Sequence, residues 1–434
     1  MSVLRFFLLV FAPAATALAN PDDFQNGTNA LNNGRYAEAA LLLGRAYEQL
    51  QRADPPRQMD ADAAAIALVA AYQFQGRIAD AERVLQPLVK RWQESKTPYL
   101  IAAVESLASV YSLKGKWPEA VQLAKESLVF ARQEYGPDHR ITRSAMANLA
   151  ALHAQQNNLA EAADLLAEAL VSARRANAGD AELLDILTGY GKIRIMQCDF
   201  EAAVVLLREA VALSAKFPGQ DVASAEASYS LAAAYYHAGY PERSEPLVKA
   251  AIAKYEATAG PDSPALAGAL MLQADLALLN HRLAAAEKLL KRTFDLLRNA
   301  FGTEDVEAAV VEARLGELAL MSRNVEKAEP LIRHSLAVMQ KTYHKPHPRL
   351  ATAYSDLGAL LANQGSYDEA ERQYKSAIAN FESIGYKGAP YIRTLESYGN
   401  ILKRTNNKNE ARQVLTRAKA LSQSLLQQNV QLGY

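Results

Sequence analysis

Three histidines in one short stretch are the residues of this chain best suited to binding a metal ion. His344 and His347 are three residues apart and follow His334, and imidazole nitrogen is a common ligand of zinc. Pro346 and Pro348 flank His347 and place it in a turn, which would fix the direction of its side chain poorly. We therefore predict that these histidines belong to a linker between structural units and bind no metal.

Other patterns that resemble catalytic motifs lack the context that their chemistry requires. Gly189-Tyr190-Gly191-Lys192 resembles part of a phosphate-binding loop, but no strand pattern precedes it. Glu105, Glu317 and Glu396 are far apart in the chain and cannot be paired as a general acid and base from the sequence. No Gly-x-Ser-x-Gly motif occurs, and Cys198 is interpreted as a small turn residue rather than a reactive thiol. These observations predict that the protein is not an enzyme and uses no cofactor.

The composition indicates a helical protein with no overall electrostatic preference. Half of the 434 residues are hydrophobic, and alanine and leucine dominate long stretches with few glycines or prolines. No segment alternates Val, Ile or Thr with polar residues as a half-buried strand would. Lys plus Arg equals Asp plus Glu, 47 against 47, so net charge gives no long-range attraction to nucleic acid. We predict an all-α fold and no nucleic-acid partner.

The first twenty residues resemble a secretory signal peptide. Arg5 provides a positive start, residues 6–11 form an apolar core, and Ala17-Leu18-Ala19 supplies the small residues of a cleavage site. We predict cleavage after Ala19 and a periplasmic or secreted mature protein; the alternative is an inner-membrane anchor formed by an uncleaved signal. No later stretch is apolar for the 18 or more residues of a membrane helix, so no integral membrane span is expected.

A small residue recurs ten times in the same local setting, every 39 to 42 residues. A fixed period of this length indicates a stack of equivalent supersecondary units. The recurring residues, called period markers below, are Ala39, Ala81, Ala120, Ala162, Ala203, Ser244, Ala286, Ala328, Ala370 and Ala411.

Each repeat has the pattern of two helices joined by a short turn. In the stretch 345–382, Pro348 is suited to a first helical turn, and apolar residues follow at spacings of three and four. Gly365 is the expected left-handed residue after the first helix, and a second helix is predicted to begin at Tyr367. Twelve residues before nearly every marker stands another Gly or Ala, such as Gly191 and Gly358, which would let the two helices of a pair approach closely. Asp305 is one of several residues placed to cap a first helix.

These residues resemble the tetratricopeptide repeat. The spacing of Leu357-Gly358, Gly365, Tyr367 and Ala370 matches its pattern, and the longer linkers, such as 135–139 and 343–348, are similar to the kinesin-light-chain type of that repeat. The resemblance implies a right-handed superhelix of about ten helix–turn–helix repeats whose first helices line a concave groove. We predict one solenoid over residues 20–434, with repeats near 22–53, 60–94, 97–134, 138–176, 180–216, 221–257, 263–300, 305–342, 347–384 and 389–426.

The resemblance also implies which residues face the groove, because these lie on first helices and point away from the packing stripe. The candidates for peptide binding are Asn148, Gln155, Lys192, Tyr229, Tyr236, His237, Arg314, Asn363, Arg393, Asn400, Lys403 and Arg404. Tyrosine is common in binding surfaces, although the tyrosines here could equally fill the core between repeats. The basic residues of the last repeat could hold a carboxylate or an acidic segment, or could be a solvated end of the solenoid.

The favoured function is a non-catalytic scaffold in the periplasm that binds a protein or peptide segment. Envelope assembly, secretion and polysaccharide export are the processes considered. The alternative is a structural role through self-association, in which the segment 425–434 or a second copy of the chain occupies the groove.

Overall fold

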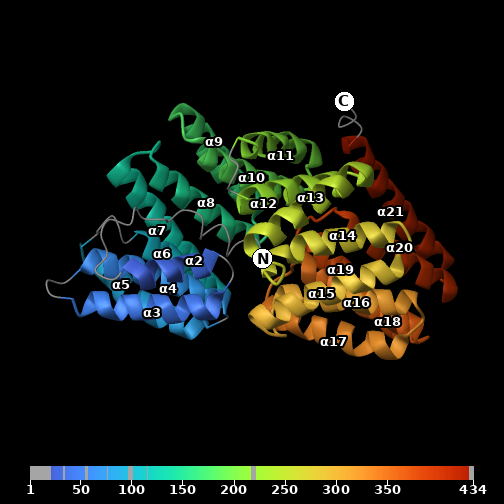
Figure 1. Ribbon diagram of the computed structural model, residues 1–434. Helices are drawn as coiled ribbons and strands as arrows, with labels where there is room; N and C mark the ends of the chain where they lie inside the picture. Colours follow the sequence, from blue (N-terminus) through green and yellow to red (C-terminus); the bar gives the residue numbers. More distant parts are fainter. Residues whose placement is uncertain are drawn as a thin grey trace. The chain divides into compact units, whose positions relative to one another are not determined.

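The computed structural model describes residues 21–32, 35–53, 57–75, 77–95, 101–114, 116–216 and 221–429. The predicted signal peptide, the predicted start of the third repeat at residues 97–98 and residues 430–434 of the tail lie outside these ranges. The described residues form ten pairs of consecutive α-helices and one short 3-10 helix, with no strand among them (Figure 1). The first helices of the pairs are α2 (Pro21–Asn32), α4 (Gln58–Phe74), α6 (Ile101–Leu113), α8 (Arg140–Gln155), α10 (Asp180–Met196), α12 (Asp221–His237), α14 (Ala267–Leu279), α16 (Val306–Met321), α18 (Pro348–Asn363) and α20 (Ala389–Arg404). The second helices are α3 (Tyr36–Gln51), α5 (Ile78–Ser95), α7 (Trp117–Tyr135), α9 (Leu159–Arg175), α11 (Phe200–Ser214), α13 (Pro241–Ala259), α15 (Leu283–Phe301), α17 (Val325–Thr342), α19 (Tyr367–Ser383) and α21 (Lys408–Asn429), and η2 (Pro264–Leu266) precedes α14. The all-α fold of helix pairs predicted from the sequence is confirmed.

The chain divides into two compact units. Unit 1 comprises residues 1–193, 206–227 and 253–265, and unit 2 comprises residues 194–205, 228–252 and 266–434. Unit 1 therefore holds the helices from α2 to α9 whole, and unit 2 holds those from α14 to α21. The single-solenoid organisation over residues 20–434 stays a prediction.

In the seven pairs from α8 and α9 to α20 and α21, the turn contains a residue in the left-handed backbone region. Gly365 has a φ of +82° and Cys198 has a φ of +61°, and each stands five residues before its period marker. Glycine adopts this conformation freely, whereas a side chain costs energy there. The prediction that Cys198 takes the place of a turn glycine is confirmed. Burial also raises the pKa of its thiol to about 11, which makes the thiol a poor nucleophile at neutral pH.

Close packing within each pair explains the ten small residues of the sequence period. Nine of the markers are fully buried and Ala411 is 1 % exposed. A Cβ added at Gly191 would lie 2.5 Å from Leu207, and one added at Gly316 would lie 2.6 Å from Ile332. The facing residue stands sixteen positions after the glycine in both pairs, so the same contact recurs in units 1 and 2.

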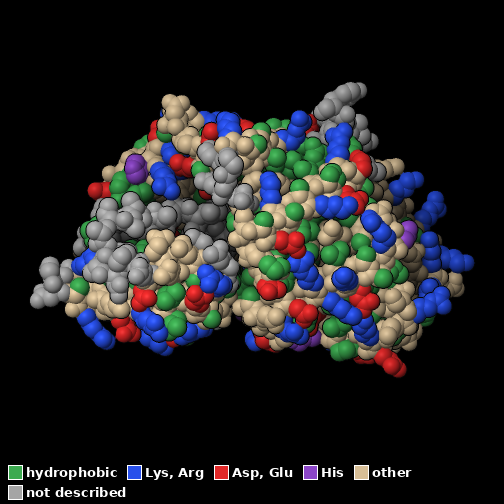
Figure 2. Space-filling view, viewed as in Figure 1, with side chains coloured by type: hydrophobic (Ala, Val, Ile, Leu, Met, Phe, Trp, Pro, Cys, Tyr) green, Lys and Arg blue, Asp and Glu red, His purple; other side chains and the backbone are tan. Residues whose placement is uncertain are grey.

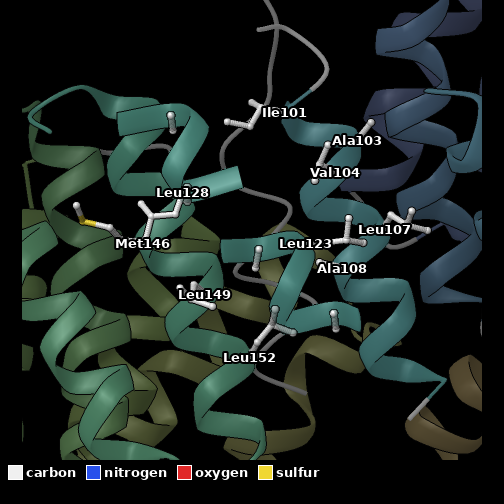
Figure 3. Close-up of a cluster of buried hydrophobic side chains, with 14 of the residues drawn as sticks. Ile101, Ala103, Val104, Leu107, Ala108, Leu123, Leu128, Met146, Leu149 and Leu152 are labelled. Atoms are coloured by element: carbon white, nitrogen blue, oxygen red, sulfur yellow. The ribbon is translucent and has the colours of Figure 1, made fainter. Parts of the chain in front are cut away.

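Each unit has its own hydrophobic core. In unit 1, side chains of α6, α7 and α8 meet around Leu107, Leu123 and Leu149 (Figure 3). In unit 2, Ile332, Leu357 and Leu402 are among the buried residues of the main cluster, which continues along α16 to α21. None of the described helices is both long and apolar enough to cross a membrane.

Helix starts confirm the capping predicted for unit 2. The carboxylate of Asp305 accepts hydrogen bonds from the backbone N–H groups of Glu307 and Ala308, both at 3.0 Å. At the start of α18, Nδ1 of His347 accepts from the N–H of Arg349 at 3.2 Å. These bonds satisfy donors that have no partner within the helix.

Candidate functional site

Five ionisable side chains from four successive first helices meet in unit 2. They are Asp275 of α14, Arg314 and Glu317 of α16, Asp356 of α18 and Arg393 of α20, and we call them the ionic cluster. The sequence period places them there, because Arg314 and Asp356 each stand fourteen residues before their marker, and Asp275 and Glu317 each stand eleven before. Positions three residues apart share one face of an α-helix.

Glu317 is the centre of the ionic cluster. Its Oε2 accepts from Nη1 of Arg314 at 2.8 Å, and its Oε1 lies 3.3 Å from Nη2 of Arg393. Arg314 also approaches Asp275, with 3.9 Å between Nη2 and Oδ2. The two cations hold the pKa of Glu317 down at about 2 although burial opposes ionisation. Glu317 is therefore charged across the physiological range.

Asp356 is the carboxyl group of this cluster that ionises less readily than usual, because its pKa is raised. Its side chain is 5 % exposed, and it shares a hydrogen bond with Glu317. Burial raises the pKa of Asp356, and the negative charge of Glu317 raises it further. Two adjacent carboxyl groups cannot both ionise cheaply. Ionisation therefore favours Glu317 over Asp356, because Glu317, not Asp356, pairs directly with both arginines.

The first helices of unit 2 curve so that their side chains converge. Packed helices lie about 8–10 Å apart, so in a flat row α12 and α20 would be separated by more than about 30 Å. Yet the charge of Arg393 acts on the pKa of Tyr236, and Arg393 reaches Glu317 past the intervening α18. The face formed by these first helices, called the inner surface below, is therefore concave.

Tyr236 and His237 of α12 lie beside the ionic cluster. The ring of His237 stacks on Phe200 at 6.0 Å between centroids and meets Tyr236 edge-on at 5.3 Å. The surrounding protein and the positive charge of Arg314 lower the pKa of His237 to about 4, so the imidazole is neutral at pH 7. Solvent still reaches His237, which is an exposed residue, as expected for a side chain on a concave face.

Exposed apolar side chains lie one helical turn from the charged positions of the inner surface. Met196, Leu279 and Met321 are 41 %, 54 % and 55 % exposed. Each stands seven residues before its marker, as does His237, so the four occupy one position at the ends of α10, α12, α14 and α16. We call them the apolar strip. Residues that stand seven, eleven and fourteen positions before the marker lie on one face of a helix. The apolar strip therefore borders the ionic cluster.

Other predicted residues of unit 2 are dispersed. Asn363 is exposed and donates to the carbonyl of Ala359 in its own helix, and Asn400 is also exposed. Tyr229 is half-buried and packs on α14, since a Cβ on Gly268 would lie 2.8 Å from its hydroxyl. These residues extend or support the inner surface but do not enter the ionic cluster.

The three basic residues of the last repeat that were predicted to form one binding site do not lie together. Arg393 is the fifth residue of α20, whereas Lys403 and Arg404 are its last two, about 15 Å further along the axis. Nη1 of Arg404 lies 3.5 Å from the hydroxyl of Tyr367. Lys403 instead borders a shallow surface on α21 with Lys408, Arg412 and Lys419, and Figure 2 shows Lys and Arg gathered along the end of the chain.

The predicted residues of unit 1 are engaged in local structure. Asn148 is 4 % exposed and its amide donates to the carboxyl of Glu105, so it belongs to the core rather than to an open surface. Lys192 pairs with Glu226 at 2.6 Å. Gln155 is half-buried in the last turn of α8. The structure thus brings together Tyr236, His237, Arg314 and Arg393 of the predicted set and leaves the others apart.

Two of the three histidines considered as metal ligands, His334 and His347, have structural partners. His347 caps α18 and stacks on Tyr343 at 3.8 Å, and burial lowers its pKa to about 3. His334 instead lies beside Glu312 and Glu304. No group of three or more metal-ligating side chains occurs among the described residues.

Sequence reasoning missed Asp275 and Asp356 as members of the site. Their positions in the repeat could have identified them. Asp275 stands eleven residues before its marker, as Glu317 does, and Asp356 stands fourteen before its marker, as Arg314 does. An Asp in a helix interior has a low helix propensity, which is a second indication that these positions serve another purpose.

Family models for tetratricopeptide repeats match the chain in both units. One model matches residues 98–175, 307–383 and 349–424, and a second matches residues 225–265. Together the matched segments cover more than half of the chain. The chain belongs to the tetratricopeptide-repeat family.

Solved structures of other repeat proteins share the fold of this tetratricopeptide-repeat protein. A Rap protein complexed with competence and sporulation factor is 10 % identical, with a TM-score of 0.61 over 85 % of this chain and 99 % of that one. The apo form of the quorum sensor NprR from B. thuringiensis is 13 % identical, with a TM-score of 0.51 over 92 % and 97 %. A putative kinesin light chain from Podosopora anserina is 19 % identical, with a TM-score of 0.37 over 45 % and 94 %. Among curated proteins, no sequence matches this chain.

Proposed function

We propose that this protein is a non-catalytic scaffold that binds a peptide or protein segment on the inner surface of unit 2. The observation that carries the proposal is the convergence of five ionisable side chains from four first helices on a concave, partly solvated face. A folding core would be more stable with apolar residues at these positions. Charged groups held half-exposed, beside exposed methionine and leucine, are instead typical of a recognition surface.

The comparisons support the same class of function. A structure similar to this chain over most of its length was solved as a complex of a Rap protein with competence and sporulation factor, and another is of a quorum sensor. Helical repeats supply extended concave surfaces for such binding. The chemical identity of the bound segment is a separate question.

A peptide display library tests the proposal with the full chain as bait. The double variant Arg314→Ala/Arg393→Ala alters the inner surface, and the matched double variant Arg372→Ala/Lys375→Ala removes two exposed cations from α19 of the same unit. We expect the wild type and the α19 variant to enrich the same sequences and the inner-surface variant to lose them. Equal enrichment by all three proteins would contradict the proposal.

We further propose that the protein is exported and acts in the cell envelope, in assembly, secretion or polysaccharide export. Support comes from the sequence alone, namely the basic start, the apolar stretch 6–11 and the small residues ending at Ala19. N-terminal sequencing of the protein isolated from its native cells tests this. A first residue of Asn20 would agree with the proposal, whereas a protein recovered from the cytoplasm with residues 1–19 intact would contradict it.

A further inference from the structure

We propose that the inner surface of unit 2 selects a peptide segment carrying a basic group, with an apolar side chain two residues away from it. The basic group would lie against Asp356 and Glu317, and the apolar side chain would lie on the apolar strip. This inference rests on the proposed function and specifies its ligand.

The charge balance of the ionic cluster carries the inference. The cluster has three carboxyl groups, on Asp275, Glu317 and Asp356, and two guanidinium groups, on Arg314 and Arg393. Addition of a third cation would give every carboxylate a partner. Addition of a carboxylate would instead place four acidic groups against two cations, which is unfavourable.

Both arginines are already engaged by acidic partners. Arg314 bonds Glu317 and faces Asp275, and Arg393 pairs with Glu317. An incoming anion would have to compete with these carboxylates for the same donors. A cation would not, because Asp356 shares a hydrogen bond with Glu317 and makes no ion pair among the contacts shown by the described residues.

Binding of a cation would favour release of a proton from Asp356. The charged groups that face Asp356 are Glu317 and Arg314 from α16 and Arg393 from α20, and the hydroxyl of Tyr374 faces it from α19. A cation placed beside Asp356 favours its ionised form and lowers its pKa. The affinity for a basic segment should therefore rise with pH until Asp356 is ionised in the free protein.

The distance between the two parts of the inner surface sets the spacing within the ligand. Positions seven and eleven before the marker are about 6 Å apart along the helix axis. Alternate residues of an extended chain point to the same side and lie about 6.6 Å apart. An extended segment that follows the first helices would therefore place an apolar side chain on Leu279 or Met321 and a basic one, two residues away, at the ionic cluster.

Three pools of blocked hexapeptides test the inference with the full chain. All pools carry Leu-Gln-X at central positions with randomised uncharged flanks, and X is Arg, its neutral isostere citrulline, or Glu. We expect retention of the Arg pool at least about tenfold above the citrulline pool at pH 7.5, since hydrogen bonds to charged groups are stronger than those to neutral groups. Asp356→Asn should remove most of this preference, whereas Glu105→Gln, a change of a buried carboxyl in unit 1, should preserve it.

The pH dependence of the wild type gives a second test that needs no variant. Retention of the Arg pool should rise with pH, because the pKa of Asp356 is raised in the free protein, while retention of the citrulline pool stays constant. Equal retention of the Arg and citrulline pools, or preference for the Glu pool, would overturn this inference and leave peptide binding intact. If no pool is retained, or if Arg314→Ala/Arg393→Ala retains all pools like the wild type, the proposed function fails with it.

Discussion

Two buried carboxyl groups, one in each unit, show how similar positions of the repeat serve different purposes. Glu105 of unit 1 is 4 % exposed, and its partners are the hydroxyl of Ser127 at 3.4 Å and the amide of Asn148. Asp356 of unit 2 is 5 % exposed, but its neighbours are the charged groups of Glu317, Arg314 and Arg393. Neutral partners make the first carboxyl part of the core. Charged, partly solvated partners make the second one responsive to an incoming charge.

The largest expected effect is a fall in the free energy of unfolding of unit 1 with rising pH, caused by Glu105. Burial raises the pKa of Glu105 from 4.5 to about 8. The unfolded chain ionises this group near its ordinary pKa, while the folded chain keeps the proton. The free energy of unfolding should therefore fall by roughly 3–5 kcal/mol as pH rises from about 4.5 to 8, and level off above that.

Urea unfolding followed by circular dichroism across this range measures the effect. Glu105→Gln should abolish the contribution and unfold at higher urea than the wild type at pH 8. Glu168→Gln, which changes an exposed carboxylate of α9, should follow the wild-type profile. A wild-type profile that matches that of Glu105→Gln would show that Glu105 is ionised in the folded protein and that the contrast between the units is wrong.

The helix pairs of both units should be equally intolerant of larger side chains at the period markers. Ala162 of unit 1 and Ala286 of unit 2 are fully buried. Replacement of either by Trp should destabilise its pair by at least about 1–3 kcal/mol, because overpacking displaces the facing helix. Thermal unfolding measures this, with Val171→Trp, at a position 57 % exposed, as the control. A melt in which Val171→Trp is the most damaging change would mean that the two faces of the helices are assigned wrongly.

The smallest effects should come from the caps of the first helices. Asp305 of unit 2 accepts two backbone N–H groups, whereas the exposed His139 of unit 1 accepts one, that of Ile141, at 3.2 Å. Asp305→Ala should cost about 1 kcal/mol, and His139→Ala should cost less. Asp305→Asn retains an accepting oxygen and should be nearly neutral. Denaturant midpoints compare the variants, and a greater loss for His139→Ala would contradict this order.

The sequence predicted the fold well because the repeat multiplies each weak signal by ten. A small residue such as Ala162 is uninformative alone, but its recurrence at a fixed period identifies the helix pair. Cys198 and Asp305 were assigned their turn and cap positions from the same register and are found there.

The site was less predictable, because its members meet through the curvature of the repeat array. Arg314 and Arg393 were recognised as solvent-facing residues of first helices, but the pairing of both with Glu317 depends on a path past α18. Asn148 occupies the same register as Arg314 and Asp356 yet is buried beside Glu105. The register defines the face of the helix, and only the neighbouring side chains decide whether a polar residue there is structural or available to a ligand.

Proton release on ligand binding is the most direct test of the difference between the two carboxyl groups. Calorimetric titration of a retained Leu-Gln-Arg peptide into the full chain at pH 7, in two buffers of different ionisation enthalpy, gives the number of protons exchanged. We predict proton release on peptide binding by the wild type and by Glu105→Gln, and no release by Asp356→Asn. Proton uptake, or binding of the peptide by the wild type with no exchange, would contradict the account.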